Sequence, residues 1–147
     1  MTREELVVCV TGAAGQIGYS FIPQLLRGNA FGNTKIHLRM LDISPAQKVL
    51  QGITMELQDC TYPLLLSLKY SDKANEMFLD ADVIVFLGGF PRKKGMERKD
   101  LLQMNKKIFV EQSEALKYAK KDVKCVVVAN PANTNAKILA HFSNVKK

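Results

Sequence analysis

The chain has 147 residues, of which 47% are hydrophobic and 24% charged, and this composition indicates one globular domain rather than a disordered segment. Lys and Arg outnumber Asp and Glu by 21 to 14, and a net charge of +7 is compatible with nucleic acid, an anionic surface or a small acidic ligand. No apolar run approaches the roughly 18–20 residues of a membrane span, and the first one is shorter than the ~7–15 residues of a signal peptide. We therefore expect no membrane insertion and no secretion.

The cysteine and histidine content argues against a disulfide framework and against a metal site. Cys9, Cys60 and Cys125 are too far apart to form a CxxC unit, and an odd number of cysteines favours reduced thiols in the cytoplasm. His37 and His141 are the only histidines, and no Cys/His spacing in the chain matches a zinc site. The sequence therefore predicts a cytoplasmic protein that holds no metal ion.

Short runs rich in β-branched residues alternate with helical patterns along the chain. Strands are predicted over 6–10, 36–41, 83–87 and 125–129, with a weaker candidate over 68–70. Helices are predicted over 16–27, 46–58 and 97–119. We expect Pro23 to bend the first of them. Ser44 is the predicted N-cap of the second, with Pro45 in its first turn. This alternation predicts an α/β fold with a doubly wound parallel sheet, helices on both faces and strand order 3-2-1-4-5.

A glycine-rich loop links the first predicted strand to the first predicted helix. Its spacing is GxxGxxG, a variant of the GxGxxG pattern, and it consists of Gly12, Ala13, Ala14, Gly15, Gln16, Ile17 and Gly18. Gly12 permits the tight turn, Gly15 lets the backbone approach a pyrophosphate, and Gly18 lets the helix pack against the sheet. The N–H groups at the start of the helix then face the phosphates. With a strand before it and a helix after it, the loop predicts a Rossmann-type dinucleotide site, the alternative being a turn without a ligand.

An acidic residue stands at the end of the second predicted strand. Asp42 lies 24 residues after Gly18, close to the spacing of the carboxylate that accepts both ribose hydroxyls of NAD. The same carboxylate would repel the 2′-phosphate of NADP. The alternative role is to cap the turn at Ser44 and Pro45, but the loop and the acid together favour NAD.

Two classes of NAD enzyme are compatible with these features. The short-chain reductases and sugar-nucleotide epimerases also begin with TGxxGxxG, but they need a Tyr-x-x-x-Lys pair for acid–base chemistry. Each tyrosine here is followed four residues later by something other than lysine, the tyrosines being Tyr19, Tyr62, Tyr70 and Tyr118. A stand-alone nucleotide-binding module without chemistry is a further alternative.

The positive charge is concentrated in one loop after the fourth predicted strand. Five of the 21 basic residues fall within positions 92–99, and glycines 88, 89 and 95 suit a segment that closes over a ligand. Arg92 and Arg98 stand six residues apart, and each can hold one carboxylate through two hydrogen bonds. A solvated basic loop is the alternative. Because the charge is local and RNA-binding aromatic motifs are absent, we expect no nucleic-acid partner.

Four segments together resemble the lactate/malate dehydrogenase family, and within it the cytosolic-type malate dehydrogenases. They are the glycine loop GAAGQIG at 12–18, MELQDC at 55–60, GFPRKKGMERKD at 89–100 and VANPANTN at 128–135. The segments occur in order over essentially the whole chain, and the last two are far more specific than the glycine loop. Arginine rather than glutamine at position 92 favours malate and oxaloacetate over lactate and pyruvate, because it adds a partner for a second carboxylate.

The resemblance implies a role for individual residues. It assigns NAD binding to residues 12–18, Asp42, Asn105, Gln112, Val128, Ala129 and Asn130. It assigns binding of the dicarboxylate to Arg92, Arg98 and Asn130. For Asn105 and Gln112, which recur at helical spacing in the third predicted helix, the alternative is hydrogen bonding to neighbouring backbone.

The resemblance also implies what these 147 residues do not carry. In the family, the histidine that moves the proton, its aspartate partner and a third arginine belong to a second domain. We therefore expect residues 1–147 to be a dinucleotide-binding domain, the catalytic domain to lie outside this chain, and the chain alone to be inactive. His37 and His141 are interpreted as surface or core residues. The family's dimer contact implies a homodimer through the helix at 46–60.

Overall fold

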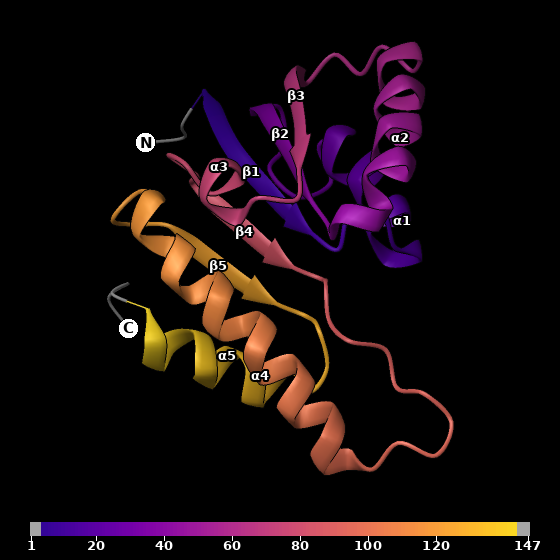
Figure 1. Ribbon diagram of the computed structural model, residues 1–147. Helices are drawn as coiled ribbons and strands as arrows, with labels where there is room; N and C mark the ends of the chain where they lie inside the picture. The colour runs from indigo at the N-terminus through magenta and orange to yellow at the C-terminus, as the bar shows by residue number, and fades with distance from the viewer. Residues whose placement is uncertain (1–3, 144–147) are drawn as a thin grey trace.

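The computed structural model describes residues 4–143, which form one five-stranded sheet with helices on both faces (Figure 1). All strand pairs are parallel, and the strand order is β3-β2-β1-β4-β5. The strands are β1 (Glu5–Thr11), β2 (Lys35–Leu41), β3 (Leu65–Ser71), β4 (Val83–Phe86) and β5 (Lys124–Val127). This confirms the Rossmann-type doubly wound fold and its predicted order.

The helices connect successive strands and divide between the two faces of the sheet. They are α1 (Gln16–Leu26), α2 (Gln47–Asp59), α3 (Ala74–Met77), α4 (Arg98–Ala115) and α5 (Ala132–Phe142), with short 3₁₀ helices η1 (Ser44–Ala46) and η2 (Leu116–Tyr118). Side chains of α1 and α2 pack in one apolar cluster, and those of α3, α4 and α5 pack in another. Among the described residues no helix is both long and apolar enough to cross a bilayer.

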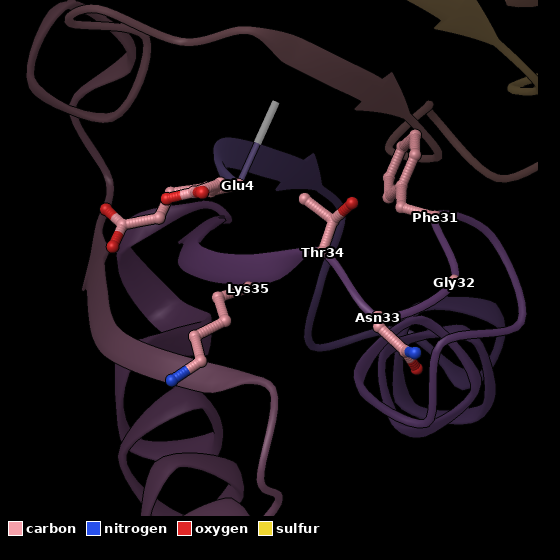
Figure 2. Close-up of a pocket in the computed structure, with 7 residues that line it drawn as sticks. Glu4, Phe31, Gly32, Asn33, Thr34 and Lys35 are labelled. Carbon is pink, nitrogen blue, oxygen red and sulfur yellow. The ribbon is translucent and has the colours of Figure 1, made fainter. Parts of the chain in front are cut away.

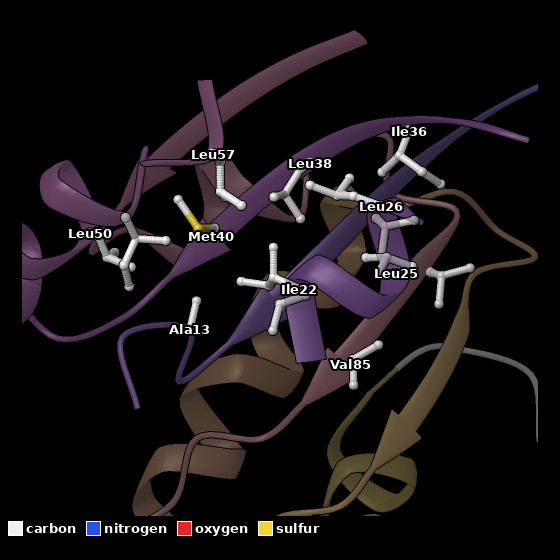
Figure 3. Close-up of a cluster of buried hydrophobic side chains, with 14 residues drawn as sticks. Ala13, Ile22, Leu25, Leu26, Ile36, Leu38, Met40, Leu50, Leu57 and Val85 are labelled. Atoms are coloured by element: carbon white, nitrogen blue, oxygen red, sulfur yellow. The ribbon is translucent and has the colours of Figure 1, made fainter. Parts of the chain in front are cut away.

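Two apolar cores hold the layers together, one on each face of the sheet. In the first, Ile36, Leu38 and Met40 from β2 meet Ile22 and Leu57 from α1 and α2 (Figure 3). The second core lies on the opposite face, because neighbouring residues of a strand point to opposite sides. All four residues of β4 are buried, as expected of a strand covered on both faces.

The helix starts differ in part from the predicted ones. Ser44 does not cap α2: it begins the 3₁₀ helix η1, and its hydroxyl donates to the carboxylate of Asp72 instead. By contrast, α4 begins with a capping box in which the Glu97 side chain accepts a backbone N–H and Asp100 accepts the Glu97 N–H. The α1 helix continues through Pro23 to Leu26.

The ends of two other elements also depart from the predicted bounds. The predicted helix 97–119 is α-helical only to Ala115, after which η2 tightens its last turn. The weak strand candidate at 68–70 is a full strand, β3, which is paired with β2 over residues 65–71. Hydropathy indicates β3 poorly because it lies at the edge of the sheet and is half exposed along its length.

The parallel arrangement brings four loops to one edge of the sheet. Since all strands run the same way, their carboxyl ends lie together, and this is where open α/β sheets bind ligands. β1 leads into the glycine loop, β2 into Asp42, β4 into the basic loop and β5 into the segment 128–131. The glycine loop, Asp42, the basic loop and the segment 128–131 therefore all follow a strand at this edge, whereas Asn105 and Gln112 lie within α4.

Candidate functional site

The glycine loop turns tightly and packs closely against its neighbours. Gly12 has a φ of 66°, and a Cβ there would stand 2.5 Å from the backbone N and Cα of Gly88. Gly18 is buried, and a Cβ there would stand 2.7 Å from the carbonyl oxygen of Ala13, so only glycine lets α1 approach the turn. Both glycines therefore have the conformational and packing roles that the spacing predicts.

The N-terminus of α1 is open to a ligand. Gly15 is the N-cap residue, no side chain caps the helix, and its first turn contains no acidic residue. Gly15, Gln16 and Ile17 are exposed, whereas Ala13 beneath them is buried. An uncapped helix start carries unsatisfied N–H donors and a partial positive charge. This edge of the loop therefore fits an anionic group such as a diphosphate.

Asp42 lies directly against the glycine loop. Its Oδ2 accepts a hydrogen bond from the N–H of Ala14 at 2.9 Å, and its Oδ1 accepts one from the N–H of Ile43 at 2.9 Å. The residue is half exposed, and a carboxylate has lone pairs beyond these two bonds. The carboxylate thus orders the turn after β2 and stays available to hydroxyl donors beside the diphosphate position, so both predicted roles are compatible with its geometry.

The basic loop makes a tight turn, a cation–π contact and a capping box. A tight turn joins the carbonyl of Lys93 to the N–H of Met96 at 3.1 Å, and Gly95 supplies the positive φ of 81° that this turn needs. The ammonium of Lys93 lies 5.5 Å from the centre of the Phe90 ring, a cation–π contact. The capping box then starts α4 immediately before Arg98.

Three residues from separate segments line one hollow. Arg92 from the basic loop, Arg98 from the first turn of α4 and Asn130 from the segment after β5 line a space of about 320 Å³, and Leu101, Leu102 and Pro131 complete the lining. The two arginines are exposed. Arg92, Arg98 and Asn130 are the three residues that the resemblance assigns to substrate binding. Together they offer two guanidinium groups and one amide to an acidic ligand.

The segment 128–130 is anchored to the end of β4. The N–H groups of Val128 and Ala129 both donate to the carbonyl of Phe86 at 3.0 Å. Ala129 is buried, whereas Val128 is 44% exposed and Asn130 is exposed. The segment therefore presents an apolar side chain and a neighbouring amide at the ligand edge.

The two polar residues of α4 behave differently. Asn105 is fully buried, and its amide bonds to the chain itself, to the N–H of Phe90 and the carbonyl of Leu101. Gln112 has a buried Oε1 with no hydrogen-bond partner among the described residues. The contacts of both residues with a cofactor stay predictions; the free acceptor of Gln112 is compatible with one, because a buried amide oxygen is costly to leave unpaired.

Neither histidine lies at this edge. His37 bonds through its ring to Ser67 Oγ at 2.8 Å and Glu5 Oε2 at 3.2 Å, near the amino ends of the strands. His141 lies in the last turn of α5 and stacks edge-on against Phe142. In the described part of the chain, no cluster of His, Cys, Asp and Glu could hold a metal ion.

A second hollow lies at the opposite edge of the sheet, where the strands begin. It has a volume of about 660 Å³ and is lined by Glu4, Glu5 and residues 31–35 (Figure 2). Its charged side chains are exposed and of both signs.

Two further hydrogen bonds support the segments of the candidate site, and the sequence alone does not predict them. The Thr11 hydroxyl accepts the N–H of Gly88 at 3.3 Å, and buried Asn135 donates from its amide to the carbonyl of Ala129 at 2.9 Å. Two sequence features could have drawn attention to these residues: the doublet Gly88-Gly89 after a buried strand, and the asparagines of NPANTN. Neither signal identifies the partner, because each bond joins residues from different elements.

Comparison with known proteins places these features in a family. Residues 6–147 match the family described as lactate/malate dehydrogenase, NAD binding domain. Cytoplasmic malate dehydrogenase of Gallus gallus is 53% identical over 137 residues, which are 92% of this chain and 41% of that protein. The chain thus spans about two fifths of the length of this relative.

Solved structures agree with this placement. Malate dehydrogenase from Naegleria fowleri matches with a TM-score of 0.95 and 40% identity, covering 100% of this chain and 46% of that one. Lactate dehydrogenase from Trichomonas vaginalis, in complex with NADH and oxamate, matches with a TM-score of 0.90 and 38% identity. The match covers 97% of this chain and 43% of that one. The chain therefore belongs to the lactate/malate dehydrogenase family, in which it corresponds to the NAD-binding domain.

Proposed function

We propose that this chain is the NAD-binding part of a cytoplasmic malate dehydrogenase, which interconverts malate and oxaloacetate. The observation that carries the proposal is the hollow at which Arg92, Arg98 and Asn130 meet. It lies at the same edge of the sheet as the glycine loop and Asp42, so one site can receive both a dinucleotide and a dicarboxylate. The cytoplasmic location is supported by the names of the relatives.

The cofactor site is built from backbone donors and one carboxylate. The N–H groups at the start of α1 hold the diphosphate of NAD, and Asp42 accepts the hydroxyls of the adenosine ribose. Val128, Ala129 and Asn130 line the nicotinamide side, with Asn105 and Gln112 behind them on α4. NAD, when bound, supplies the chemistry of hydride transfer at its nicotinamide ring.

The arginines select the substrate by charge. Each guanidinium can form a bidentate pair with one carboxylate, so Arg92 and Arg98 together fit a dicarboxylate such as malate. The Asn130 amide, on the third side of the hollow, hydrogen-bonds the substrate and orients it. A monocarboxylate such as lactate would leave Arg92 without a partner, and this favours malate and oxaloacetate.

Proton transfer is assigned to residues outside this chain. The described residues place no histidine at the hollow, and the family resemblance assigns this step to a histidine–aspartate pair of a second domain. A missing general base commonly lowers a rate by ~10²–10⁴-fold. We therefore expect the 147-residue chain alone to bind NADH and to reduce no measurable oxaloacetate.

A homodimer through α2 is part of the same proposal. On α2, Val49 is 52% exposed and Met55 is 61% exposed. The Tyr19 hydroxyl of α1 donates to Glu56 of α2 at 2.8 Å, so the two helices form one continuous surface. Exposed apolar side chains on such a surface suit a second copy of the chain.

Two alternative functions, a short-chain reductase or epimerase and a stand-alone nucleotide-binding module, receive less support. No tyrosine of the chain is followed by lysine four residues later, as a short-chain reductase or epimerase would need. The relatives from Gallus gallus, Naegleria fowleri and Trichomonas vaginalis are malate and lactate dehydrogenases. A stand-alone nucleotide-binding module gives no reason for two arginines and an amide around one hollow.

Replacing Arg92 tests the proposal. In the presence of NAD, Arg92→Gln should weaken binding of L-malate about 10–150-fold, the equivalent of one charge-assisted bond, and change binding of L-lactate much less. Lys94→Gln is the matched control, because it removes the same charge from an exposed position of the same loop. Isothermal titration calorimetry measures both ligands. Equal losses for malate and lactate would refute the role of Arg92.

A further inference from the structure

Two fully buried asparagines lie on two helices that pack side by side. Asn105 is on α4 and Asn135 is on α5, and each has an exposed fraction of 0% (Figure 1 shows the two helices). Burying an amide is unfavourable unless its polar atoms find partners. Asn105 bonds through both of its amide atoms, whereas Asn135 bonds through Nδ2 and its Oδ1 has no partner among the described residues; in both cases the bonded partner is backbone next to the candidate substrate hollow.

Asn105 ties the base of the basic loop together. Its Oδ1 accepts the N–H of Phe90 at 3.0 Å, and its Nδ2 donates to the carbonyl of Leu101 at 2.9 Å. Phe90 stands two residues before Arg92, and Leu101 stands three residues after Arg98. One side chain thus joins the two ends of the segment that carries both arginines.

Gly89 makes this contact possible. A Cβ at Gly89 would stand 2.9 Å from Asn105 Oδ1 and 3.4 Å from the Cβ of Ala129. The backbone before the basic loop therefore lies directly on the amide of α4 and against the segment after β5. Any side chain at position 89 would push these groups apart.

Asn135 holds the other half of the hollow. Its Nδ2 donates to the carbonyl of Ala129 at 2.9 Å, while the N–H of Ala129 donates to Phe86 at 3.0 Å. Ala129 is buried and immediately precedes Asn130, which lines the hollow. The position of Asn130 thus depends on an amide that itself lies away from solvent.

We propose that Asn105 and Asn135 are a pair of positioning residues that keep the arginine loop and the Asn130 segment at the separation at which one dicarboxylate can contact both. The inference rests on the proposed function and adds to it the reason why the hollow has its shape. Both asparagines act through the backbone they hold, and neither needs to touch substrate. Because α4 and α5 pack against each other, the two held segments share one rigid support.

Three variants and two controls test the pair in the 147-residue chain. Asn105→Ala and Asn135→Ala each remove one amide, and Gly89→Ala displaces the contact while leaving Asn105 in place. Gln103→Ala on α4 and Asn133→Ala on α5 are the controls, because both residues are exposed on the same helices. Thermal unfolding of every variant identifies any that fail to fold.

The first measurement is amide hydrogen exchange followed by NMR. Asn105→Ala and Gly89→Ala should speed exchange of the Phe90 N–H about tenfold or more, while the N–H groups of buried β4 stay protected. The controls should leave the Phe90 N–H unchanged. This readout does not require a substrate, so it remains informative even if the proposed function is wrong.

The second measurement separates positioning from general stability. Below the unfolding transition, Asn105→Ala and Asn135→Ala should weaken binding of L-malate in the presence of NAD by about fivefold or more. In Asn135→Ala, binding of NAD alone should change by less than about twofold, because NAD affinity depends mainly on the glycine loop and Asp42. A protected Phe90 N–H with unchanged malate affinity in Asn105→Ala would overturn the inference. Equal weakening of malate binding by Arg92→Gln and Lys94→Gln would refute the proposed function instead.

Discussion

Gly12 and Gly88 meet backbone to backbone, and this contact joins the cofactor loop to the start of the basic loop. A Cβ on Gly12 would stand 2.5 Å from the N and Cα of Gly88, and a Cβ on Gly88 would stand 2.9 Å from the N of Gly12. The hydroxyl of Thr11 accepts the Gly88 N–H and holds the two turns together. The dinucleotide position and the arginine loop therefore have one common base.

We predict that Gly12→Ala destabilises the domain. Its φ of 66° strains any other residue by roughly 1–2 kcal/mol, and the new methyl group also collides with Gly88. A total of about 2–4 kcal/mol should lower the melting temperature by roughly 5–15 °C in a domain of this size. Thermal unfolding followed by circular dichroism measures the shift.

Gly52→Ala is the matched control for this prediction. Gly52 lies inside α2, is exposed, and a Cβ there would meet nothing within 4 Å. Alanine in an exposed helix interior is favoured over glycine by about 0.5–1 kcal/mol, so this variant should melt at a slightly higher temperature. If Gly12→Ala and Gly52→Ala shifted the melting temperature alike, the contact with Gly88 would have no energetic importance.

We predict that Asp42 determines the preference for NAD over NADP. Asp42→Ser removes the carboxylate that accepts ribose hydroxyls and the charge that repels a 2′-phosphate. Loss of charge-assisted bonds worth about 1.5–3 kcal/mol should weaken NADH binding at least roughly tenfold, while NADPH binding weakens less or improves. Fluorescence titration of the chain with each cofactor gives the ratio of dissociation constants.

The control for Asp42 is Asp59→Ser, at the exposed end of α2. It removes one carboxylate at a position away from the glycine loop and should leave the ratio unchanged. An unchanged ratio in Asp42→Ser would mean that another residue discriminates between the cofactors. Because Asp42 also accepts the Ala14 N–H, a modest loss of thermal stability is expected with the altered preference.

The three thiols should differ in reactivity. Burial raises the pKa of the Cys9 thiol strongly and that of Cys125 to about 11, whereas Cys60 is exposed at the end of α2. Since the thiolate is the nucleophile, the raised pKa makes Cys125 much less reactive than an ordinary thiol at pH 8. Iodoacetamide should therefore label Cys60 first, and mass spectrometry should find all three labelled only after unfolding. Labelling of Cys9 before Cys60 would contradict this burial.

Local patterns in the sequence were sufficient for the architecture. Apolar runs and helical spacing predict the strands and the helices α1, α2 and α4, and right-handed crossovers favour the observed strand order. The roles of Gly12 and Gly18 follow from their spacing alone, because a tight turn and close packing restrict those positions to glycine. Weak local signals were less reliable: Ser44 bonds to Asp72 rather than capping α2, because β2 and β3 are parallel neighbours and bring together the two residues that follow their ends.

The sequence alone determined which chemical groups follow each strand, whereas only the tertiary structure decided which of them meet. Arg92 and Asn130 are 38 positions apart in the chain, yet they line one hollow because β4 and β5 are parallel neighbours. The burial of Asn105 against Phe90 depends in the same way on how α4 lies across the sheet. Local sequence patterns determine the local backbone geometry. A contact between distant segments depends instead on the packing of the whole domain, and no single stretch of sequence encodes it.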